Sequence, residues 1–420
     1  MTIQSVKGTR DFFPDDMAIQ SWLKTLIRDS SESFGYQEYD GPFLETVELY
    51  AAKSGEELVK EQSFVFPDRG GDLLTLRPEL TPSLARMVAA LGRSIVRPVR
   101  WWSYGPFWRY EKPQKGRTRE FFQWNLDMLG IDTPQADAEV AAVAVTFLKK
   151  AGLSSDQVKL YINNRRLADK KLQELGIESE DRAAVFRLID RRDKLSFPSW
   201  KESALSEGLS ESQLNGLLET LSDHTSWEHF EELVLFFDAC RDLGVSDYIE
   251  YEPTIIRGLD YYTGTVFEAR DESSEYRAIL GGGRYDNLVA DVGGEPISGV
   301  GFAMGDVVIG ILLKELGLVP ELSPNPSQIL VTTFDDNLMS KSLDICQKLR
   351  ASGLSVEWYP VSSRLSKQFK YANRQGIPMV VIMGPDEAEA GNVTIKNMRT
   401  GDQSTVALED LASVASKFFD

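Results

Sequence analysis

The densest group of side chains that could do chemistry lies in the stretch FWRYEKPQKGRTRE. Between Arg109 and Arg119 it contains one acid, Glu111, and five basic residues: Arg109, Lys112, Lys115, Arg117 and Arg119. Guanidinium groups bind phosphate oxygens through paired hydrogen bonds, so several at one point neutralise an anion with many negative oxygens. A triphosphate is the natural ligand. A solvated hairpin tip is the alternative, but Arg109, Gln123 and Asp127 lie among large aromatic residues, where a buried charge needs a partner.

Three other clusters contain polar groups or glycines in unusual places. LRPELTP places Arg77, Glu79 and Thr81 after a predicted strand, although a plain strand end followed by a helix cap has the same pattern. RGLDYYTG puts an arginine, an aspartate and two tyrosines between apolar residues. GGGRYDNLV and the later GVGFAMG have glycines that let a ligand or another backbone approach closely. The glycine spacing of GVGFAMG differs from a dinucleotide-binding fingerprint.

The scarcity of histidine and cysteine excludes several kinds of active site. The two histidines, His224 and His229, are five residues apart and do not share a helical face. A His-ligated metal centre and a Ser-His-Asp triad are therefore not expected. The two cysteines, Cys240 and Cys346, belong to no CxxC pair, and we expect buried, reduced thiols. Catalysis must then rely on arginines, carboxylates, tyrosines and backbone groups.

The bulk composition is that of an ordinary globular protein. With 420 residues, of which 42% are hydrophobic and 26% charged, we expect two or three domains. No apolar run approaches the roughly 20 residues that span a bilayer, and the N-terminus lacks a secretory signal, so we expect a cytoplasmic protein without a membrane segment. The net charge of −18 argues against a general nucleic-acid binder. The part of the chain from Ser327 onward contains 10 Lys and Arg and 11 Asp and Glu. Any RNA contact would therefore be a local basic patch.

The elements that position these clusters can be predicted from apolar spacing. A helix is expected over 15–34, ended by Gly35, and a second begins at the Thr81-Pro82 pair. SFVFP, DRGG and DLLTL form a predicted β-hairpin. VRWWSYGPFWRY and REFFQWNLDMLG are strands on either side of the basic loop, which favours an antiparallel sheet.

The remaining patterns predict the domain organisation. A helix-rich insertion is expected at about 163–246, and residues 321–327, within VPELSPNPSQ, form the predicted linker. Beyond it, strand and helix patterns alternate as βαβαβ, which predicts a small α/β domain with a parallel sheet over 328–420. We therefore expect an α+β protein whose first domain, 1–320, is built on an antiparallel sheet flanked by helices.

The order and wording of the clusters resemble the histidyl-tRNA synthetases, a family of class II aminoacyl-tRNA synthetases, over nearly the whole chain. The stretch from Arg109 to Asp127 resembles class II motif 2, and YDGPFLE, with Pro42, is similar to motif 1 at the dimer interface. RGLDYYTGTVFE and GGGRYD resemble the two histidine signatures of the family. RLSKQFKYANRQGIPMVVIMG resembles its anticodon-binding domain.

The resemblance implies an activity, its substrates and a homodimer. L-histidine would be activated with ATP to histidyl-adenylate and pyrophosphate, with Mg²⁺ expected, and then transferred to the 3′ end of tRNA(His). The histidine pocket would be formed by Glu79, Leu80, Thr81, Arg109, Gln123, Asp127, Arg257, Tyr261, Tyr262 and Tyr285. ATP would be bound by Arg109, Glu111, Arg117 and Arg119. Arg109 and Arg257 would be the catalytic pair, stabilising the transition state of phosphoryl transfer.

One position departs from the family pattern. Class II motif 3 usually ends in an arginine that contacts the ATP γ-phosphate, and Val308 occupies the expected position. Such a charge-assisted contact is typically worth about 1.5–3 kcal/mol. The alternative function is a non-catalytic regulator that senses histidine, like the regulatory subunit of ATP phosphoribosyltransferase. Such regulators usually lack the anticodon-binding domain and the motif 2 and RGLDYYTG residues, all of which this chain keeps.

A basic stripe in the C-terminal domain is the candidate tRNA contact. Arg364, Lys367, Lys370 and Arg374 recur at spacings of three, three and four, which puts all four on one face of a helix. Phe369 and Tyr371 would be available for packing or base stacking. The alternative is a solvated helix face, because cationic stripes on helices are common.

Overall fold

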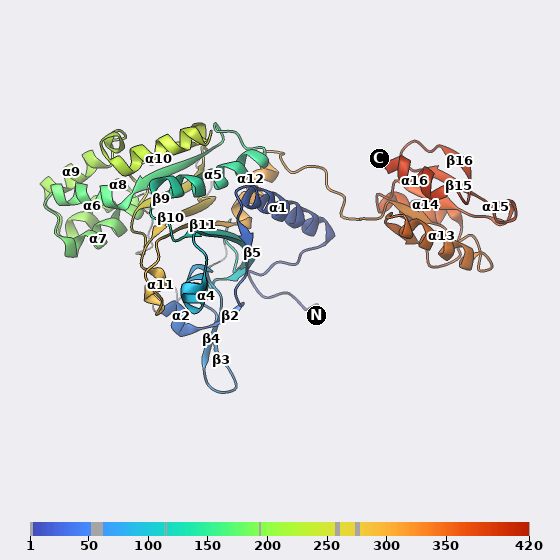
Figure 1. The fold of residues 1–420 in the computed structure, drawn as a ribbon, viewed down its shortest axis with the longest axis horizontal. Helices are drawn as coiled ribbons and strands as arrows, with labels where there is room; N and C mark the ends of the chain where they lie inside the picture. Colours follow the sequence, from blue (N-terminus) through green and yellow to red (C-terminus); the bar gives the residue numbers. More distant parts are fainter. Residues whose placement is uncertain are drawn as a thin grey trace. The chain divides into compact units, whose positions relative to one another are not determined.

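The computed structural model describes residues 3–51, 62–112, 114, 116–192, 195–256, 261–273 and 278–419. The chain forms two compact units (Figure 1), one of Met1–Asp11 with Ser21–Pro320 and one of Phe12–Gln20 with Glu321–Asp420. Helix α1 (Pro14–Glu32) forms where its apolar spacing predicts, and the chain turns at Gly35, whose φ of +79° favours glycine.

A large sheet dominates the first unit. From β5 to β7 in the spatial order, every neighbouring pair is antiparallel, and the two outer strands pair parallel with β5 and β7. The predicted antiparallel sheet and the α+β class are therefore confirmed. In spatial order the strands are β1 (Gln37–Glu38), β5 (Val99–Trp108), β6 (Glu120–Leu129), β11 (Gly299–Gly305), β10 (Leu280–Tyr285), β9 (Thr265–Asp271), β7 (Val158–Asn164) and β8 (Ile249–Tyr251).

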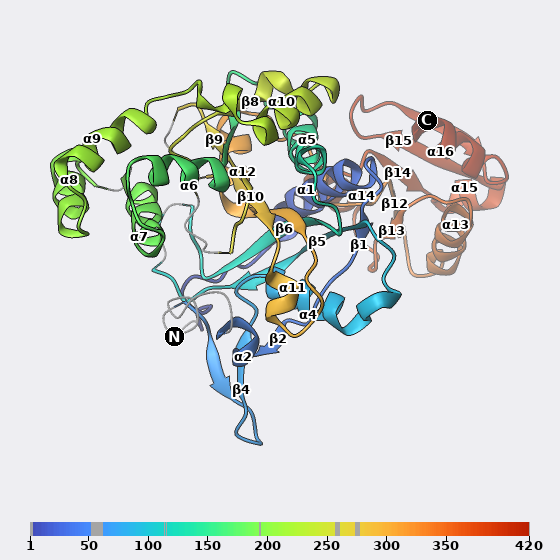
Figure 2. The same ribbon diagram turned by 60° about the vertical axis from the view of Figure 1, so that its left-hand side comes forward.

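One face of this sheet carries the main core. Helix α5 (Pro134–Lys150) packs along it and α10 (Glu231–Asp242) packs on α5, as Figure 2 shows. On β6, Trp124, Leu126 and Met128 join this core. Residues of a strand alternate between faces, so Gln123 and Asp127 lie on the opposite face. There α4 (Thr81–Leu91) and α11 (Leu288–Asp291) share a second cluster with Tyr285.

A small sheet carries the predicted hairpin. Strands β3 (Val65–Pro67) and β4 (Leu73–Leu76) pair antiparallel, which confirms the hairpin, and β2 (Leu44–Thr46) pairs with the other edge of β4. Short elements complete the unit: α2 (Val47–Ala51), α12 (Asp306–Glu315) and the 3₁₀ turns Gly92–Ser94, Ser226–His229 and Ser246–Tyr248.

The guanidinium of Arg77 joins the small sheet to the large one. It is completely buried, and it donates to the carbonyls of Pro106 at 2.9 Å and Gly41 at 3.0 Å and pairs with the carboxylate of Asp40. Gly105 makes room for it, because a Cβ there would lie 2.5 Å from the Arg77 Nη2. A side chain at position 105 would therefore displace the charge.

The predicted helical insertion forms helices with their own core. These are α6 (Arg165–Glu174), α7 (Ser179–Asp190), α8 (Phe197–Ser206) and α9 (Glu211–Thr220). Their buried residues, from Leu172 to Leu221, cluster with Ile256 apart from the main core. The last helix of the predicted range, α10, belongs to the main core instead, where Cys240 is buried.

The second unit has a five-stranded sheet in the order β13-β12-β14-β15-β16. The first three strands are parallel, as the βαβαβ pattern predicts, but β15 and β16 add an antiparallel hairpin that the sequence analysis did not include. Gly401, with a φ of +84°, lies in its turn. The elements are β12 (Ile329–Val331), α13 (Met339–Ala351), β13 (Val356–Trp358), α14 (Leu365–Arg374), β14 (Met379–Ile382), α15 (Pro385–Ala390), β15 (Asn392–Asn397), β16 (Gln403–Ala407) and α16 (Leu411–Phe419).

Within the described part of the chain, no helix has both the length and the apolar character needed to cross a membrane.

Candidate active site

The basic stretch and the glycine-rich segment meet at a cavity of about 160 Å³ in the first unit. Its walls come from the β5–β6 connection, from β6, and from the junction of β11 and α12. The lining residues are Arg109, Glu111, Gly116, Arg117, Thr118, Phe121, Gln123, Ala278, Ile279, Gly305, Val307 and Val308. Two patterns that lie almost 200 residues apart in the sequence therefore form one hollow with guanidinium groups in its wall.

Arg109 connects the cavity to the LRPELTP segment. Its Nε donates to the carbonyl of Pro78 at 2.9 Å, and its guanidinium lies 5.4 Å from the centre of the Phe121 ring. The Pro78 bond uses the Nε, and the guanidinium has further N–H donors that could bind oxygen ligands. Arg109 is therefore placed to contact an anion in the cavity.

The other predicted ATP residues take different positions. Glu111 is buried, and its carboxylate forms an ion pair with the Nε of Arg117, whose side chain is 42% exposed. Both line the cavity. Arg119 is absent from the lining: its Nε donates to the Glu111 carbonyl at 3.1 Å, and its guanidinium lies 4.1 Å from the Tyr110 ring centre. It contacts the loop instead. Lys115 lies outside the described residues.

The N-terminal segment KGTRD fixes both walls of the cavity, which sequence reasoning missed. Gly8 accepts hydrogen bonds from the backbone nitrogens of Arg119 and Glu120 at 2.8 and 3.2 Å. Arg10 pairs with the buried carboxylate of Asp306 at 2.9 Å. The same carboxylate accepts from the backbone nitrogen of Phe122 on β6 at 2.9 Å, so it holds the start of α12 against β6. A single arginine near the N-terminus gave no local signal for this role.

A polar row runs along β6 beside the cavity. Gln123, Asn125 and Asp127 share one face of the strand, and the Gln123 Nε2 donates to the Asn125 Oδ1 at 2.7 Å. Asp127 accepts a hydrogen bond of 2.6 Å from the Tyr285 hydroxyl. Across the strand pair stands Gly301, where a Cβ would lie 2.1 Å from the Asp127 Oδ1. The glycine of GVGFAMG is thus needed to admit this carboxylate.

Tyrosines surround the end of this row. The ring of Tyr261 packs edge-on against Tyr285, with centroids 6.2 Å apart, and lies 4.8 Å from the ring of Tyr262. The structure therefore brings Asp127, Tyr261, Tyr262 and Tyr285 together. The predicted Arg257 lies outside the described residues.

The buried polar atoms without a hydrogen-bond partner among the described residues include the hydroxyl of Tyr39 and the Nδ2 of Asn125. Buried polar groups are nearly always paired, so these two atoms, although neither residue lines the 160 Å³ cavity, are candidate contacts for a ligand. Sequence reasoning gave neither residue a role in the site, because Tyr39 is the first residue of the motif 1 segment YDGPFLE, which was expected at the dimer interface, and Asn125 looks like one more polar residue of a strand.

Burial gives the Asp127 carboxyl unusual acid–base properties. It raises the pKa of Asp127 to about 7, although the hydrogen bond from Tyr285 acts in the opposite direction. Burial, and after it the neighbouring Asp127, also holds the pKa of Tyr285 well above its ordinary value, so this phenol keeps its proton. A ligand that carries a positive charge or an N–H donor would stabilise the ionised form of Asp127.

The Glu79–Thr81 segment reaches the site through its neighbour Pro78, which accepts from Arg109. Glu79 is buried, and its carbonyl accepts from the Tyr50 hydroxyl at 3.1 Å. Leu80 is completely buried at the start of α4, and Thr81 is the first residue of that helix. Leu80 could contact a ligand only through its backbone.

Val308, at the position where an arginine was expected, lines the cavity with an almost fully buried side chain. Its Cγ2 lies 3.5 Å from where a Cβ of Gly116 would stand, so it packs near the tip of the basic loop. The position at which the family pattern expects an arginine is therefore occupied by an aliphatic side chain that packs in the cavity wall.

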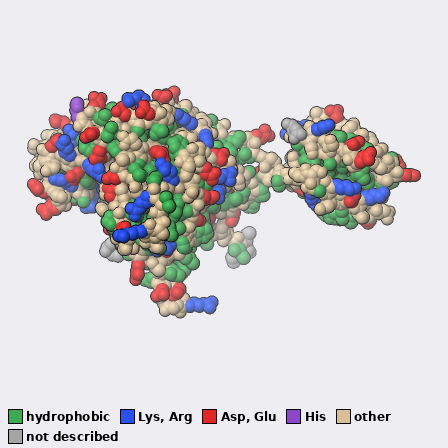
Figure 3. Space-filling view, viewed as in Figure 1, with side chains coloured by type: hydrophobic (Ala, Val, Ile, Leu, Met, Phe, Trp, Pro, Cys, Tyr) green, Lys and Arg blue, Asp and Glu red, His purple; other side chains and the backbone are tan. Residues whose placement is uncertain are grey.

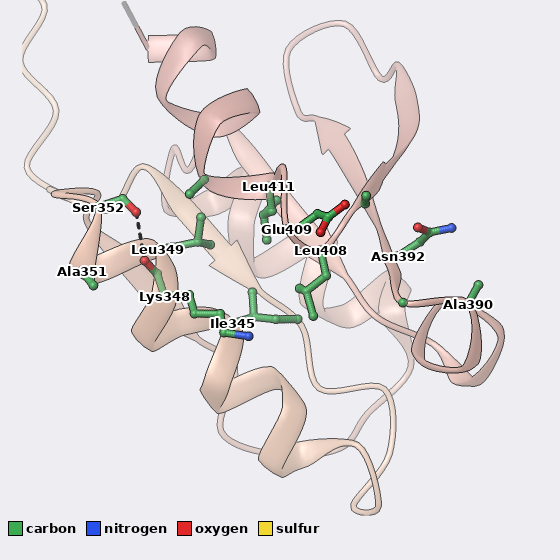
Figure 4. Close-up of a pocket in the computed structure, with 13 residues that line it drawn as sticks. Ile345, Lys348, Leu349, Ala351, Ser352, Ala390, Asn392, Leu408, Glu409 and Leu411 are labelled. Carbon is green, nitrogen blue, oxygen red and sulfur yellow. Dashed lines mark hydrogen bonds between the residues drawn. The ribbon is translucent and has the colours of Figure 1, made fainter.

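A wider hollow, of about 810 Å³, lies in the second unit between α13 and the segment that precedes α16. Figure 4 shows that its floor is mostly aliphatic, with Ile345, Leu349, Leu408 and Leu411 facing it. Its one lysine, Lys348, pairs with Asp344 at 2.8 Å. None of the residues predicted for catalysis or binding lines it, and it offers no cluster of guanidinium groups to a phosphate.

The predicted basic stripe is exposed on α14, with Gln368 and Ala372 on the buried side of the helix. Its members Arg364, Lys367, Lys370 and Arg374 are all solvent-accessible. Phe369 and Tyr371 are used in packing: Lys396 lies 4.8 Å from the Phe369 ring centre, and the Tyr371 hydroxyl donates to Glu357 at 2.7 Å.

The pKa of Asp127 yields a prediction about stability. Its unfolded pKa is about 3.9 and its folded pKa about 7, so the folded protein binds the extra proton and loses stability as pH rises from about 4 to about 7. Asp127→Asn removes this titration. Relative to the variant, the wild type should lose about 2 kcal/mol of unfolding free energy between about pH 5.5 and about pH 8. Unfolding by denaturant at both pH values measures this difference in unfolding free energy. Asp156→Asn, at an exposed aspartate, should show the same change in unfolding free energy with pH as the wild type. If Asp127→Asn and Asp156→Asn showed the same change, the titration could not be assigned to Asp127.

Comparison with known proteins gives the family. The family model for histidyl-tRNA synthetase matches residues 8–306, and that for an anticodon binding domain matches residues 328–418. The chain is 38% identical over 431 residues to the histidine–tRNA ligase of Thermoplasma volcanium, covering 99% of each chain. It is 37% identical over 415 residues to the chloroplastic/mitochondrial histidine–tRNA ligase of Arabidopsis thaliana, covering 96% of this chain and 85% of that one. The crystal structure of histidyl-tRNA synthetase from Nostoc sp. PCC 7120 superimposes with a TM-score of 0.84 at 26% identity over 99% of both chains. The chain belongs to the histidyl-tRNA synthetase family of class II aminoacyl-tRNA synthetases.

Proposed function

We propose that this enzyme activates L-histidine with ATP and transfers it to the 3′ end of tRNA(His). The observation that carries the proposal is the meeting of two sites on one sheet face. The cavity with Arg109 and Arg117 in its wall shares Gln123 with the polar row that ends at Asp127. Anion binding and binding of a nitrogen base are thus placed side by side, as joining histidine to ATP requires.

In the first step an oxygen of the histidine carboxylate attacks the α-phosphorus of ATP, and pyrophosphate leaves. Arg109 would contact both the carboxylate and the α-phosphate, since its guanidinium is fixed by the Pro78 carbonyl and by the Phe121 ring. Arg257, on the opposite side, is assigned by family resemblance. Catalysis is then alignment of two anions and stabilisation of charge in the transition state, which requires no histidine or cysteine.

The imidazole of the substrate would lie against the tyrosines, with an N–H donating to Asp127. The Tyr39 hydroxyl and the Asn125 amide are further candidate partners, because both are buried without one among the described residues. Glu79, Thr81 and Gln123 would bind the amino group. A substrate with a cationic amino group suits these acceptors.

The outer phosphates of ATP would be bound by Arg117, which the buried carboxylate of Glu111 holds at the cavity. Mg²⁺ would neutralise charge on these phosphates. The described residues contain no group of three or more His, Cys, Asp or Glu that could hold a metal, and the Glu111 carboxylate already pairs with Arg117. An ion that enters with ATP and is bound mainly by phosphate oxygens and water fits this site.

The alternative, a regulator that only senses histidine, is favoured by one observation, Val308 in place of an arginine. A sensor would still use the Asp127 pocket but would have no need of Arg109 and Arg117 in a common cavity.

Histidine alone among the twenty amino acids should support ATP–pyrophosphate exchange in the presence of Mg²⁺, because Asp127 and the tyrosines select an aromatic base with an N–H donor. The measurement is incorporation of labelled pyrophosphate into ATP, with each amino acid in turn. Arg109→Ala, which loses transition-state contacts, should lower the rate by about 10²–10³. If no amino acid supports exchange although histidine binds in calorimetry, the regulator should replace the enzyme as the conclusion.

We also propose a homodimer formed through motif 1. Pro42, Phe43 and Leu44 are exposed in this segment, and the adjoining hairpin exposes Phe66 and Leu73, which are 39% and 55% accessible. Grouped apolar side chains of this kind mark protein–protein contacts.

Replacing Phe66 and Leu73 together by Asp should convert a dimer into a monomer, because two charges would be desolvated at the interface. Sedimentation velocity at micromolar concentration measures the mass, for which the chain contributes 47.1 kDa. Leu205→Asp, at an apolar residue of similar exposure (37%) on α8, is the control and should remain dimeric. A monomeric, active wild type would contradict the proposal.

The exposed stripe on α14 is the proposed contact for the anticodon arm. On the face that Figure 3 shows, Lys and Arg side chains are interspersed with Asp and Glu. Because the protein has a net charge of −18, it would bind RNA through a local group of basic side chains such as this stripe. Phe369 and Tyr371 are engaged in packing, so the proposal now rests on phosphate contacts and not on base stacking.

Replacing Lys367 and Lys370 by Glu should weaken tRNA binding and reduce its salt dependence, by about 0.7–0.9 in the logarithmic slope for each lost phosphate contact. The control with the same charge change is Lys341→Glu with Lys348→Glu on α13. Filter binding across a salt series measures both, and histidine-dependent exchange, which needs no tRNA, should be unchanged. Equal slopes for the two double variants would assign tRNA binding to another surface.

A further inference from the structure

The first helix of the insertion contacts the segment that carries the pocket tyrosines. Arg166, near the start of α6, donates from its Nε to the carbonyl of Thr263 at 3.1 Å. Its Nη1 donates to Glu232 at 2.9 Å and its Nη2 to Asp286 at 3.4 Å. The preceding residue, Arg165, donates from its backbone nitrogen to the Gly264 carbonyl at 2.9 Å. One turn of helix thus reaches three segments of the catalytic unit.

Thr263 is the point on which these contacts converge. Its backbone nitrogen donates to the Arg284 carbonyl at 2.8 Å and its hydroxyl to Asp286 at 2.5 Å. Asp286 also accepts from the Ser298 hydroxyl at 2.6 Å. Burial alone would raise the pKa of Asp286, but the hydrogen bonds from Ser298 and Thr263 and the nearby arginines outweigh it and lower the pKa, so the group is a carboxylate at neutral pH.

The tyrosines of the histidine pocket directly precede this anchored residue. Tyr261 packs on Tyr285, and Tyr285 donates to Asp127, so a continuous series of contacts joins Arg166 to the pocket. Because Tyr262 is adjacent to Thr263 in the chain, a shift of the Thr263 backbone would be transmitted to both rings.

A role in folding alone does not account for this arginine. Its side chain is 42% exposed, and exposed ion pairs contribute little to global stability. The helix is anchored without it, since Asn164 caps its N-terminus and Leu167 and Leu172 are buried. What Arg166 adds is a fixed position for Thr263 relative to the helix.

We propose that Arg166 is a positioning residue for histidine: by holding Thr263 against Asp286 it fixes Tyr261 and Tyr262 in the pocket, and it thereby makes the helical insertion a support of amino-acid recognition. The inference rests on the proposed function, histidine activation.

The test compares Arg166→Ala with a matched control in the same insertion. Arg182 forms an ion pair with Asp169 at 2.8 Å, where Arg166 pairs with two acids, and like Arg166 it donates its Nε to a carbonyl, that of Ile177, at 3.0 Å. Neither of these contacts reaches the tyrosine segment. Arg182→Ala therefore removes an ion pair and a bond to a carbonyl from a more buried arginine of the insertion, 14% exposed against 42% for Arg166, and leaves the pocket unchanged.

Pyrophosphate exchange should give KM for histidine and for ATP, with melting temperatures measured in parallel. Arg166→Ala should raise KM for histidine about tenfold to a hundredfold, the effect of losing one charge-assisted hydrogen bond, while KM for ATP stays within about twofold. Arg182→Ala should leave both constants unchanged, whatever its melting temperature. Arg166→Lys keeps the positive charge but lacks the planar guanidinium that contacts Thr263, Glu232 and Asp286 together, so it should show a smaller increase in KM for histidine. If the alanine variant does not fold, the lysine variant replaces it in this comparison.

Two results would overturn the inference in an active enzyme: equal effects of Arg166→Ala and Arg182→Ala, or an equal rise in KM for histidine and ATP. A wild type without histidine-dependent exchange would overturn the proposed function itself, so the two failures are distinguishable.

Discussion

The catalytic unit depends on one buried charge, the guanidinium of Arg77. Removing such a group from water is costly unless its hydrogen bonds are replaced, and here Asp40, Gly41 and Pro106 accept from its Nε and Nη1. The rings of Phe43 and Phe107 lie 4.6 and 4.4 Å from the guanidinium carbon, while the Nη2 has no hydrogen-bond partner among the described residues. These partners belong to the motif 1 segment and to β5, so satisfying one side chain fixes both. The residue that follows is Pro78, whose carbonyl holds Arg109. The position of Arg109, the proposed catalytic arginine, thus depends on a charge that is completely buried.

The polar row on β6 shows how the same sheet supports a core and a site. Trp124 and Leu126 are buried against the helices, whereas Gln123, Asn125 and Asp127 point to the other face, where only part of their hydrogen bonding is satisfied. Gly301 allows the Asp127 carboxylate to approach the next strand closely. Burial raises the free-energy cost of ionising this carboxylate in the folded protein. A ligand that donates an N–H to it would recover part of that cost when it binds.

Local patterns in the sequence were sufficient for most of the elements, and they named several residues that line the cavity but also Arg119, which does not line it. The hairpin and the antiparallel sheet follow from alternation, and the helix that begins at Thr81 follows from the proline in its first turn, signals that act over a few residues. Arg10 with Asp306 and Arg166 with Asp286 could not be predicted, because each pair joins residues more than a hundred positions apart and arginine is common in this chain. The β15–β16 hairpin was missed because its polar, exposed second strand lacks an apolar run. The domain limits and the roles of the site residues remain predictions.

The electrostatics of the cavity explain how a triphosphate could be bound without an arginine at position 308. The wall that contains Val308 is the start of α12, where backbone N–H groups carry partial positive charge. Asp306, the first residue of that helix, would oppose an anion, but Arg10 neutralises its carboxylate from the N-terminal segment. On the opposite wall Glu111 reduces the net charge of Arg117 but restricts where this exposed side chain points. Under the proposed function, attraction for phosphates would be distributed over Arg109, Arg117 and a helix terminus, so the loss of one contact need not abolish binding.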